Sequence, residues 1–155
     1  MTANTHNMRD LDQWVCWRYE ERNSELTKVP YSPLTAERAD ITNPATCANF
    51  TDAVAACREH GFDGIGFVFT EDDPFCGADF DHCRDPETGK IETWAQEIIE
   101  ELDSYSEVSP SGTGVHVLAK GELPPGRNRK GRFEVYDRGR YFTVTGRHLA
   151  GTPRP

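Results

Sequence analysis

Short stretches in which apolar and polar residues alternate constrain the fold of this chain more than any other feature. Alternation with a period of two places successive side chains on opposite faces of a β-strand, whereas a helix requires apolar residues three or four positions apart. Turn residues, such as those at positions 71–74, separate the stretches. We expect strands at 14–19, 26–31, 65–70, 75–81, 105–108, 114–119, 132–136 and 141–145, with 65–70 and 75–81 forming a pair.

Two segments carry a helical pattern instead. Asn43-Pro44 places a capping residue before a proline and predicts the start of a helix that ends at Gly61. A second helix is predicted over 91–102. The residues expected on the apolar faces of these helices are Phe50, Val54 and Cys57, and Trp94, Ile98 and Leu102. Strands with two helices predict an α+β fold, in which helices pack on a mostly antiparallel or mixed sheet.

Length and composition indicate one intracellular domain. The chain has 155 residues, of which 36% are hydrophobic, and no apolar run is long enough to cross a membrane. The polar start of the chain differs from a signal peptide, so we expect a cytoplasmic protein. The five cysteines form no regular framework and no CxxC pair, which favours reduced, mostly buried thiols over a zinc site.

The charge is unevenly distributed. The net charge is −9, but positions 120–147 hold eight basic and three acidic residues, which gives that window +5 and the rest of the chain −14. A basic stretch of this kind can attract phosphate groups, although a solvated loop with scattered arginines would look the same. Lysine is scarce and acids are abundant, a balance that suggests a halophilic host. In high salt the electrostatic attraction between this basic stretch and DNA would be screened. The DNA would then have to be bound through short-range contacts and metal ions.

Asp79-Phe80-Asp81 is the strongest local signal for chemistry. In a strand, both aspartates would face one side and Phe80 the other. Two neighbouring carboxylates repel each other unless a cation lies between them, and hard oxygen ligands suit Mg²⁺ or Mn²⁺. Aspartates are also common in turns, so this motif alone is weak.

A second motif runs from Ser109 to His116, with the sequence Ser-Pro-Ser-Gly-Thr-Gly-Val-His. The glycines at 112 and 114 would allow backbone N–H groups to converge, and hydroxyl groups would add donors, which together suggest a phosphate-binding loop. His116 would point away from the core, where it could donate to a phosphate oxygen. An ordinary hairpin loop with a surface histidine is the alternative.

The third motif is the expected strand around Glu134, which would share its face with Arg132 and Tyr136. An ordinary cross-strand ion pair would explain it as well. If the strands are neighbours, however, Asp79, Asp81, His116 and Glu134 lie on one sheet surface. Three carboxylates, a histidine and nearby arginines are what two-metal nucleotidyl transfer requires.

In their order along the chain, these motifs resemble the archaeo-eukaryotic primase superfamily, and within it the bifunctional primase-polymerases of viruses and plasmids. The likeness covers about residues 12–150. Besides the loop from Ser109 to His116, three further segments are similar to sequences of that family: Lys28-Val29-Pro30-Tyr31, Gly64-Ile65-Gly66-Phe67, and the segment from Arg140 to Gly146.

The resemblance implies a primase-polymerase catalytic fold with an RRM-like core. It implies that Asp79, Asp81 and Glu134 bind two Mg²⁺ or Mn²⁺ ions and are catalytic. Tyr141 would exclude a 2′-hydroxyl group from the sugar site. The implied nucleotide-binding residues are Ser109, Ser111, Gly112, Gly114, His116, Arg140 and Tyr141, and the candidates for DNA contact are Lys28, Arg127, Arg129, Lys130 and Arg132.

The expected function is therefore template-dependent nucleotidyl transfer in the replication of a virus, plasmid or mobile element. Its partners would be a single-stranded template or primer-template, nucleoside triphosphates and a helicase domain elsewhere in a longer chain. Residues 1–150 would form the catalytic domain and 151–155 the start of a linker. The sequence shows no helical extension for primer initiation, so templated extension is expected more than de novo priming. The alternatives are a non-catalytic replication module that binds single-stranded DNA or nucleotide, and a two-metal nuclease.

Overall fold

The computed structural model describes residues 7–121 and 133–154, together with the backbone of 129–130. The chain forms two compact units. Unit 1 comprises Met1–Val68 and Tyr141–Thr143, and unit 2 comprises Phe69–Arg140 and Val144–Pro155. The chain thus leaves unit 1, forms most of unit 2, and returns to unit 1 for three residues.

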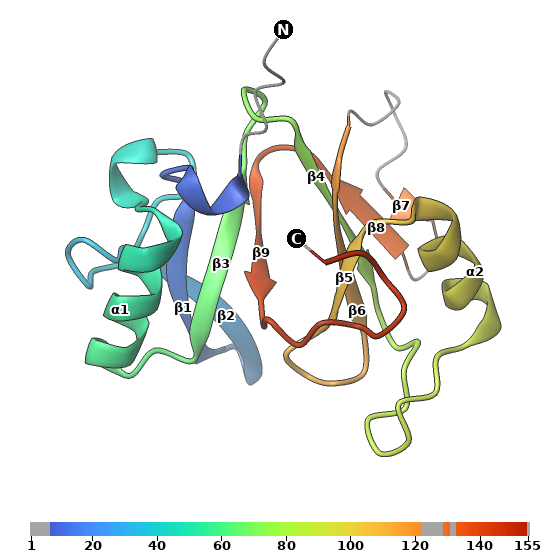
Figure 1. The fold of residues 1–155 in the computed structure, drawn as a ribbon. Coiled ribbons are helices and arrows are strands. Elements are labelled where there is room, and N and C mark those ends of the chain that lie inside the picture. The colour runs from blue at the N-terminus through green and yellow to red at the C-terminus, as the bar shows by residue number, and fades with distance from the viewer. Residues whose placement is uncertain (1–6, 122–128, 131–132, 155) are drawn as a thin grey trace, which may run out of the picture. The chain divides into compact units, whose positions relative to one another are not determined.

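Unit 1 is built on a four-stranded sheet with the strand order β2-β1-β3-β9 (Figure 1). β1 pairs antiparallel with both β2 and β3, so that Cys16 lies between Tyr31 and Ile65. The strands are β1 (Trp14–Arg22), β2 (Glu25–Tyr31), β3 (Gly64–Phe69) and β9 (Arg140–Val144), and the helices are η1 (Met8–Asp10), η2 (Pro44–Thr46) and α1 (Phe50–His60).

Helix α1 begins later than the sequence predicted. Asn43 caps only the short 3₁₀ turn η2, because Ala48 then forms a β-bridge with Trp14 and the chain must become extended there. The α-helix starts after a second cap, where Asn49 accepts a hydrogen bond from the N–H of Asp52. Its end at Gly61, in the left-handed conformation with φ 68°, is as predicted.

Unit 2 contains a five-stranded sheet with the order β5-β6-β4-β8-β7, in which all neighbouring strands are antiparallel. Its strands are β4 (Phe75–Phe80), β5 (Tyr105–Val108), β6 (Val115–Lys120), β7 (Arg129–Lys130) and β8 (Phe133–Tyr136), and its helix is α2 (Thr93–Leu102).

The predicted pairing of 65–70 with 75–81 is wrong, since β3 and β4 belong to different sheets. The Asp73 carboxylate accepts hydrogen bonds from the backbone N–H groups of Thr70 and Phe75, at 2.8 and 2.7 Å. The Asp73 side chain therefore adds two hydrogen bonds to the backbone hydrogen bond between Asp73 N–H and the Thr70 carbonyl group.

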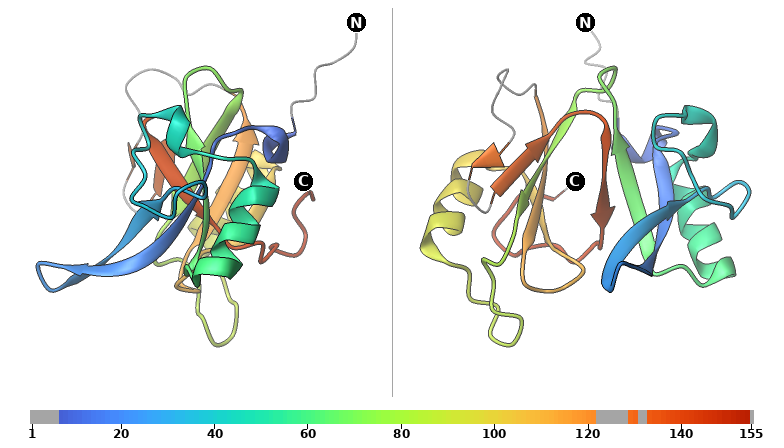
Figure 2. Two further views of the ribbon diagram at one scale, coloured as in Figure 1. Left: turned by 90° about the vertical axis from the view of Figure 1, so that its left-hand side faces the viewer. Right: turned by 180° about the vertical axis from the view of Figure 1, so that it is seen from behind.

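Helix α2 packs on one face of the sheet in unit 2 (Figure 2). The buried residues of this layer are Ala78, Phe80, Cys83, Ala95, Ile99, Val115 and Val117. Trp94 and Ile98 pack against them as predicted, whereas Leu102, expected on the same face, is 40% exposed at the end of the helix. The α+β class is confirmed, with one helix for each sheet in place of two helices on one sheet.

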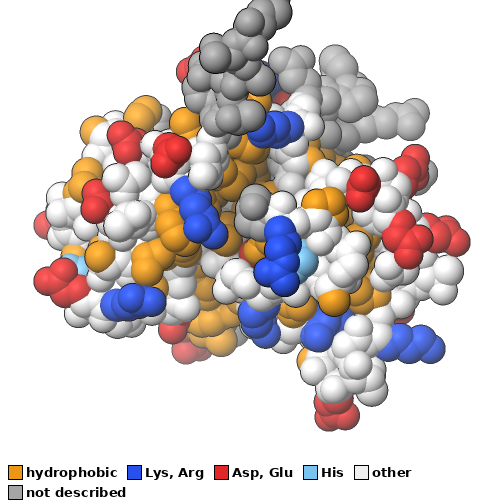
Figure 3. Space-filling view, viewed as in Figure 1, with side chains coloured by type: hydrophobic (Ala, Val, Ile, Leu, Met, Phe, Trp, Pro, Cys, Tyr) orange, Lys and Arg blue, Asp and Glu red, His pale blue; other side chains and the backbone are white. Residues whose placement is uncertain are grey.

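The surface carries many acidic side chains and the cysteines are unpaired, as the amino-acid composition suggested. Acidic side chains are spread over the surface in Figure 3. All five cysteines are free thiols, and Cys16, Cys47 and Cys83 are buried. Within the described residues, no helix has the length and apolar character needed to cross a membrane.

Candidate active site

A row of titratable side chains crosses the sheet of unit 2 on the face opposite α2. Asp79 of β4 lies directly opposite His116 of β6 and opposite Glu134 of β8. His116 in turn lies opposite Glu107 of β5. Residues directly opposite each other in antiparallel strands share a face, and the neighbours of these residues along β4 and β6 are in the core with α2. Of the four residues predicted on one sheet surface, the strand pairing places Asp79, His116 and Glu134 there, whereas Asp81 lies just beyond the end of β4.

His116 and Asp79 form a close contact at the centre of this row. The Nε2 atom of His116 lies 3.2 Å from a carboxylate oxygen of Asp79. The His116 side chain is 8% exposed and that of Asp79 is 25% exposed. Asp79 thus fixes the orientation of the imidazole ring, while part of its own carboxylate remains accessible.

Asp81 follows β4 immediately and adds a third carboxylate. Although Asp81 is an exposed residue, the pKa of its carboxyl group is raised, first by the atoms packed around it and then by the negative charge of Asp79, with a smaller contribution from Glu134. The histidines at 82 and 116 act in the opposite direction. The raised pKa of Asp81 therefore reflects burial of its carboxyl group first and the nearby negative charges second.

Three carboxylates of this kind fit a divalent cation in their chemistry, because Mg²⁺ and Mn²⁺ prefer oxygen ligands. A cation would also relieve the repulsion that raises the pKa of Asp81. In the described part of the chain, however, no three Asp, Glu, His or Cys side chains already converge at metal-binding distances.

The loop from Ser109 to Gly114 is closed by its own hydrogen bonds. The N–H groups of Gly112, Thr113 and Gly114 donate to Ser109 O, Ser111 Oγ and Ser109 Oγ, at 3.0, 3.3 and 3.0 Å. This differs from the prediction that the backbone N–H groups would converge on a ligand. The hydroxyl groups of Ser111 and Thr113, which lie 2.8 Å apart, are the donors that remain adaptable, because a hydroxyl hydrogen can rotate.

The other predicted nucleotide-binding residues are divided between the units. In unit 2, the guanidinium carbon of Arg140 lies 4.9 Å from the centre of the Tyr136 ring. In unit 1, the Tyr141 hydroxyl donates to the backbone carbonyl of Lys28, and burial raises the pKa of Tyr141. The Lys28 ammonium lies 5.9 Å from the centre of the Trp17 ring. The structure therefore brings Lys28 and Tyr141 together.

Two of the remaining candidates for DNA contact lie in the edge strand of the sheet in unit 2. Arg129 and Lys130 form β7, and their backbones pair with Glu134 and Phe133. Arg127 and Arg132 lie outside the described residues.

Sequence reasoning missed three residues beside these groups: Arg84, Glu107 and Arg147. Glu107 is fully buried, and both arginines donate hydrogen bonds to carbonyl groups of the loop that begins at Ser109. An acidic residue inside an apolar strand was a signal for Glu107, because a buried carboxylate must find hydrogen-bond donors. No comparable sequence signal distinguishes the two arginines from other surface arginines.

Comparison with known proteins supports the resemblance described above. No family model matches the chain. Over 145 residues, however, it is 39% identical to a DNA primase-polymerase of Nitratiruptor phage NrS-1. The match covers 90% of this chain and 20% of the phage protein, so the chain spans about one fifth of its relative's length. The relationship that the motifs predicted is confirmed, and the chain is a homologue of one part of a phage DNA primase-polymerase.

Proposed function

We propose that this chain, over residues 1–150, is the catalytic domain of a DNA primase-polymerase and carries out template-dependent nucleotidyl transfer with two Mg²⁺ or Mn²⁺ ions. The observation that carries the proposal is the placement of Asp79 between His116 and Glu134 on one sheet surface, with Asp81 beside them. The relative's name supports the same activity. Residues 151–155 would begin the linker to further domains, among them a helicase.

The side chains divide the work as follows in this proposal. Asp79, Asp81 and Glu134 hold the metal ions, which when bound stabilise the attacking and leaving oxygens of the transfer. His116, held by Asp79, donates to a phosphate oxygen of the incoming nucleotide. Arg140, held over the Tyr136 ring, contributes positive charge for the triphosphate.

Other residues are proposed to contact the sugar of the nucleotide and the template. Tyr141, whose hydroxyl is tied to the Lys28 carbonyl, has the fixed ring that a steric sugar filter needs. Lys28, Arg127, Arg129, Lys130 and Arg132 are the proposed contacts for single-stranded template or primer-template. The proposed setting is the host cytoplasm during replication of a virus, plasmid or mobile element.

The topology of unit 2 favours the RRM-like core expected for such an enzyme. The elements β4, α2, β5 and β6 follow one another as in the first part of a split β-α-β motif. β6 then pairs with β4, and β8 adds to the other side of β4. The result is an antiparallel sheet whose polar row crosses β5, β6, β4 and β8.

A non-catalytic module that binds single-stranded DNA or nucleotide is the second candidate. One observation favours it: among the described residues, no three ligand side chains already converge on a metal position. Such a module would bind DNA equally well after Asp79→Ala and would never extend a primer.

An extension assay separates the candidates. The wild-type chain is incubated with a labelled primer-template, nucleotides and Mn²⁺, once with ribonucleotides and once with deoxynucleotides. We expect longer products, and we expect Asp79→Ala, Asp81→Ala and Glu134→Ala each to reduce extension by roughly 100-fold or more, because each loses a metal ligand.

Glu97→Ala is the matched control, since Glu97 is an exposed acid on α2. It should extend the primer like the wild type. Shorter products would identify a nuclease, and DNA binding without any product would identify a binding module. Full activity in the three acidic-site variants would refute the metal assignment.

A further inference from the structure

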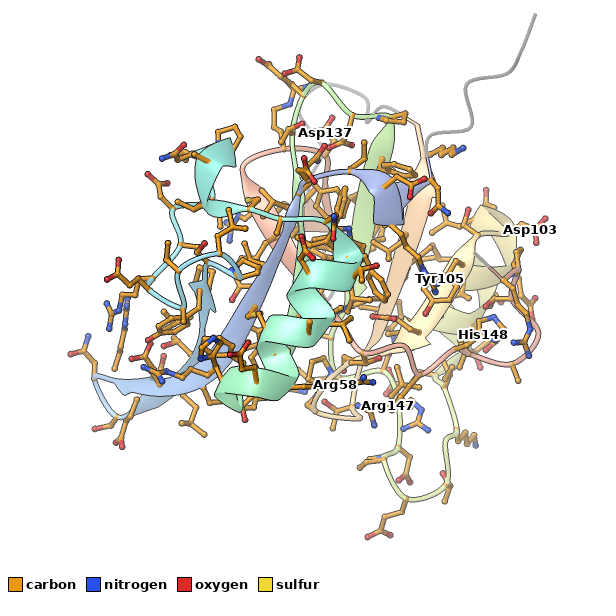
Figure 4. All side chains as sticks on the ribbon, turned by 60° about the vertical axis from the view of Figure 1, so that its left-hand side comes forward. Arg58, Asp103, Tyr105, Asp137, Arg147 and His148 are labelled. Carbon is orange, nitrogen blue, oxygen red and sulfur yellow. The ribbon has the colours of Figure 1, made fainter. Side chains whose placement is uncertain are left out.

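Two arginines outside the proposed metal site hold the Ser109–Thr113 loop by its carbonyl groups. Nη1 of Arg84 donates to the carbonyl oxygen of Gly112 at 2.8 Å. Nη2 of Arg147 donates to the carbonyl oxygens of Ser109 and Pro110, the latter at 3.2 Å. Arg147 comes from the segment that follows β9 (Figure 4).

The backbone completes this arrangement. The carbonyl oxygen of Thr113 accepts hydrogen bonds from the N–H groups of Cys83 and Arg84, both at 3.0 Å. Four carbonyl groups of the loop, those of residues 109, 110, 112 and 113, thus have donors. A free carbonyl oxygen carries partial negative charge and would repel a phosphate, whereas a carbonyl bound to a guanidinium group is electrostatically compensated.

A buried carboxylate holds the two residues that precede Arg147. Glu107 is 0% exposed and accepts hydrogen bonds from the N–H groups of Thr145 and Gly146, at 2.8 and 3.0 Å, and from the Tyr105 hydroxyl at 2.9 Å. The N–H of Arg147 then donates to the Thr145 hydroxyl oxygen at 3.1 Å. The turn that precedes Arg147 is therefore fixed by a side chain of the edge strand β5.

A ring contact supports the other side of this segment. The imidazole ring of His148 stacks on Tyr105, with the ring centres 5.6 Å apart and the planes at 12° (Figure 4). Its Nε2 atom lies 2.9 Å from the carbonyl oxygen of Thr152. The residue after Arg147 is thus also tied to unit 2, which limits the positions that the Arg147 side chain can reach.

We propose that Arg147 is a positioning residue for the incoming nucleotide. It holds the carbonyl side of the loop so that the adaptable hydroxyl groups of Ser111 and Thr113 are presented to a phosphate group. Glu107 supports Arg147 indirectly, because it binds the backbone of the turn that precedes Arg147. This inference rests on the proposed function, because the phosphate in question is that of the nucleoside triphosphate.

The test compares Arg147→Gln and Arg147→Lys with the wild type. In the extension assay, Arg147→Gln should raise the nucleotide KM by roughly 10- to 100-fold, the effect of losing a charge-assisted hydrogen bond, while kcat changes far less. Arg147→Lys keeps a positive donor and should recover part of the loss. Arg58→Gln, an exposed arginine in the last turn of α1, should leave KM unchanged.

Amide hydrogen exchange in the nucleotide-free chain gives a readout independent of activity. The amides of Gly112, Thr113 and Gly114 should exchange faster in Arg147→Gln, because the loop has lost its hold. Unchanged loop exchange in this variant would overturn the inference. Equal losses in kcat and nucleotide affinity in both Arg147 variants, with no rescue by lysine, would also overturn it.

Different results would refute the proposed polymerase function and the proposed role of Arg147. A wild-type chain that neither extends a primer nor binds a nucleoside triphosphate in Mn²⁺ would refute the proposed function and the nucleotide part of this inference. The exchange rates would still show whether Arg147 holds the loop.

Discussion

Asp81 is the residue whose ionisation should respond most to a bound cation. Its pKa is raised by the packing around its carboxyl group and by the charges of Asp79 and Glu134. A carboxyl group whose pKa is higher in the folded than in the unfolded state favours folding at low pH, and this contribution is lost as the pH rises through the folded-state value. At neutral pH without divalent metal, the ionised Asp81 therefore destabilises the fold.

We predict that Asp81→Asn melts at a higher temperature than the wild type at pH 7 in a chelator. The gain should be small, roughly 1–2 °C, because solvent screens the charge of an exposed carboxylate. It should disappear near pH 3, where the carboxyl group is protonated in both states. Thermal unfolding at the two pH values measures both effects.

Adding Mn²⁺ should reverse this order, because a ligand that binds the folded state stabilises only the variant that can hold it. Asp72→Asn is the control, since Asp72 is an exposed acid in the turn before β4. An Asp81→Asn variant stabilised by Mn²⁺ as much as the wild type would contradict the assignment of Asp81 as a ligand.

At the level of strands and helices, the sequence predicted the features that follow from the local pattern of polar and apolar residues, such as the face on which a strand residue lies. Alternation of side chains was sufficient to place Asp79 and Glu134 on the polar face, because a strand has only two faces. Pairing could not be predicted in the same way, since Phe67, Val68 and Phe69 are buried in succession and have no polar face. The Arg147 contacts were not predictable either, because they join segments distant in the sequence.

The close approach of β3 and β9 gives a prediction for this level. A Cβ atom on Gly66 would lie 2.8 Å from the carbonyl oxygen of Phe142 and 2.8 Å from the Tyr141 ring. Gly66→Ala should therefore lower the free energy of unfolding by about 1–3 kcal/mol, the usual cost of overpacking. Urea denaturation measures this.

Leu26→Ala provides the comparison in the same sheet, because Leu26 is 71% exposed on β2. Its effect should stay within about 0.5 kcal/mol. Equal stabilities of the Gly66→Ala variant and the wild type would show that β9 can move away from β3 without loss.

For the molecule as a whole, charge is the dominant property. The chain carries −9 at neutral pH, and acidic side chains lie at several places on the face drawn in Figure 3. Mutual repulsion among surface charges destabilises a compact state and is screened by salt.

We therefore predict that raising KCl from about 0.1 to 1 M, where the screening length falls from about 10 to 3 Å, increases the melting temperature. The same titration of an Asp- or Glu-to-Gln variant with lower net charge should show a smaller increase. A melting temperature that falls with KCl in the wild type would contradict a role for charge repulsion.

The return of the chain to unit 1 has a consequence for biosynthesis. β3 is completed early, but its neighbour β9 leaves the ribosome only after every strand of unit 2 has been made. Until then the nascent polypeptide presents an apolar strand with one unpaired edge, the kind of surface that chaperones shield and that promotes aggregation. Translation speed across unit 2 should therefore influence the yield of native protein.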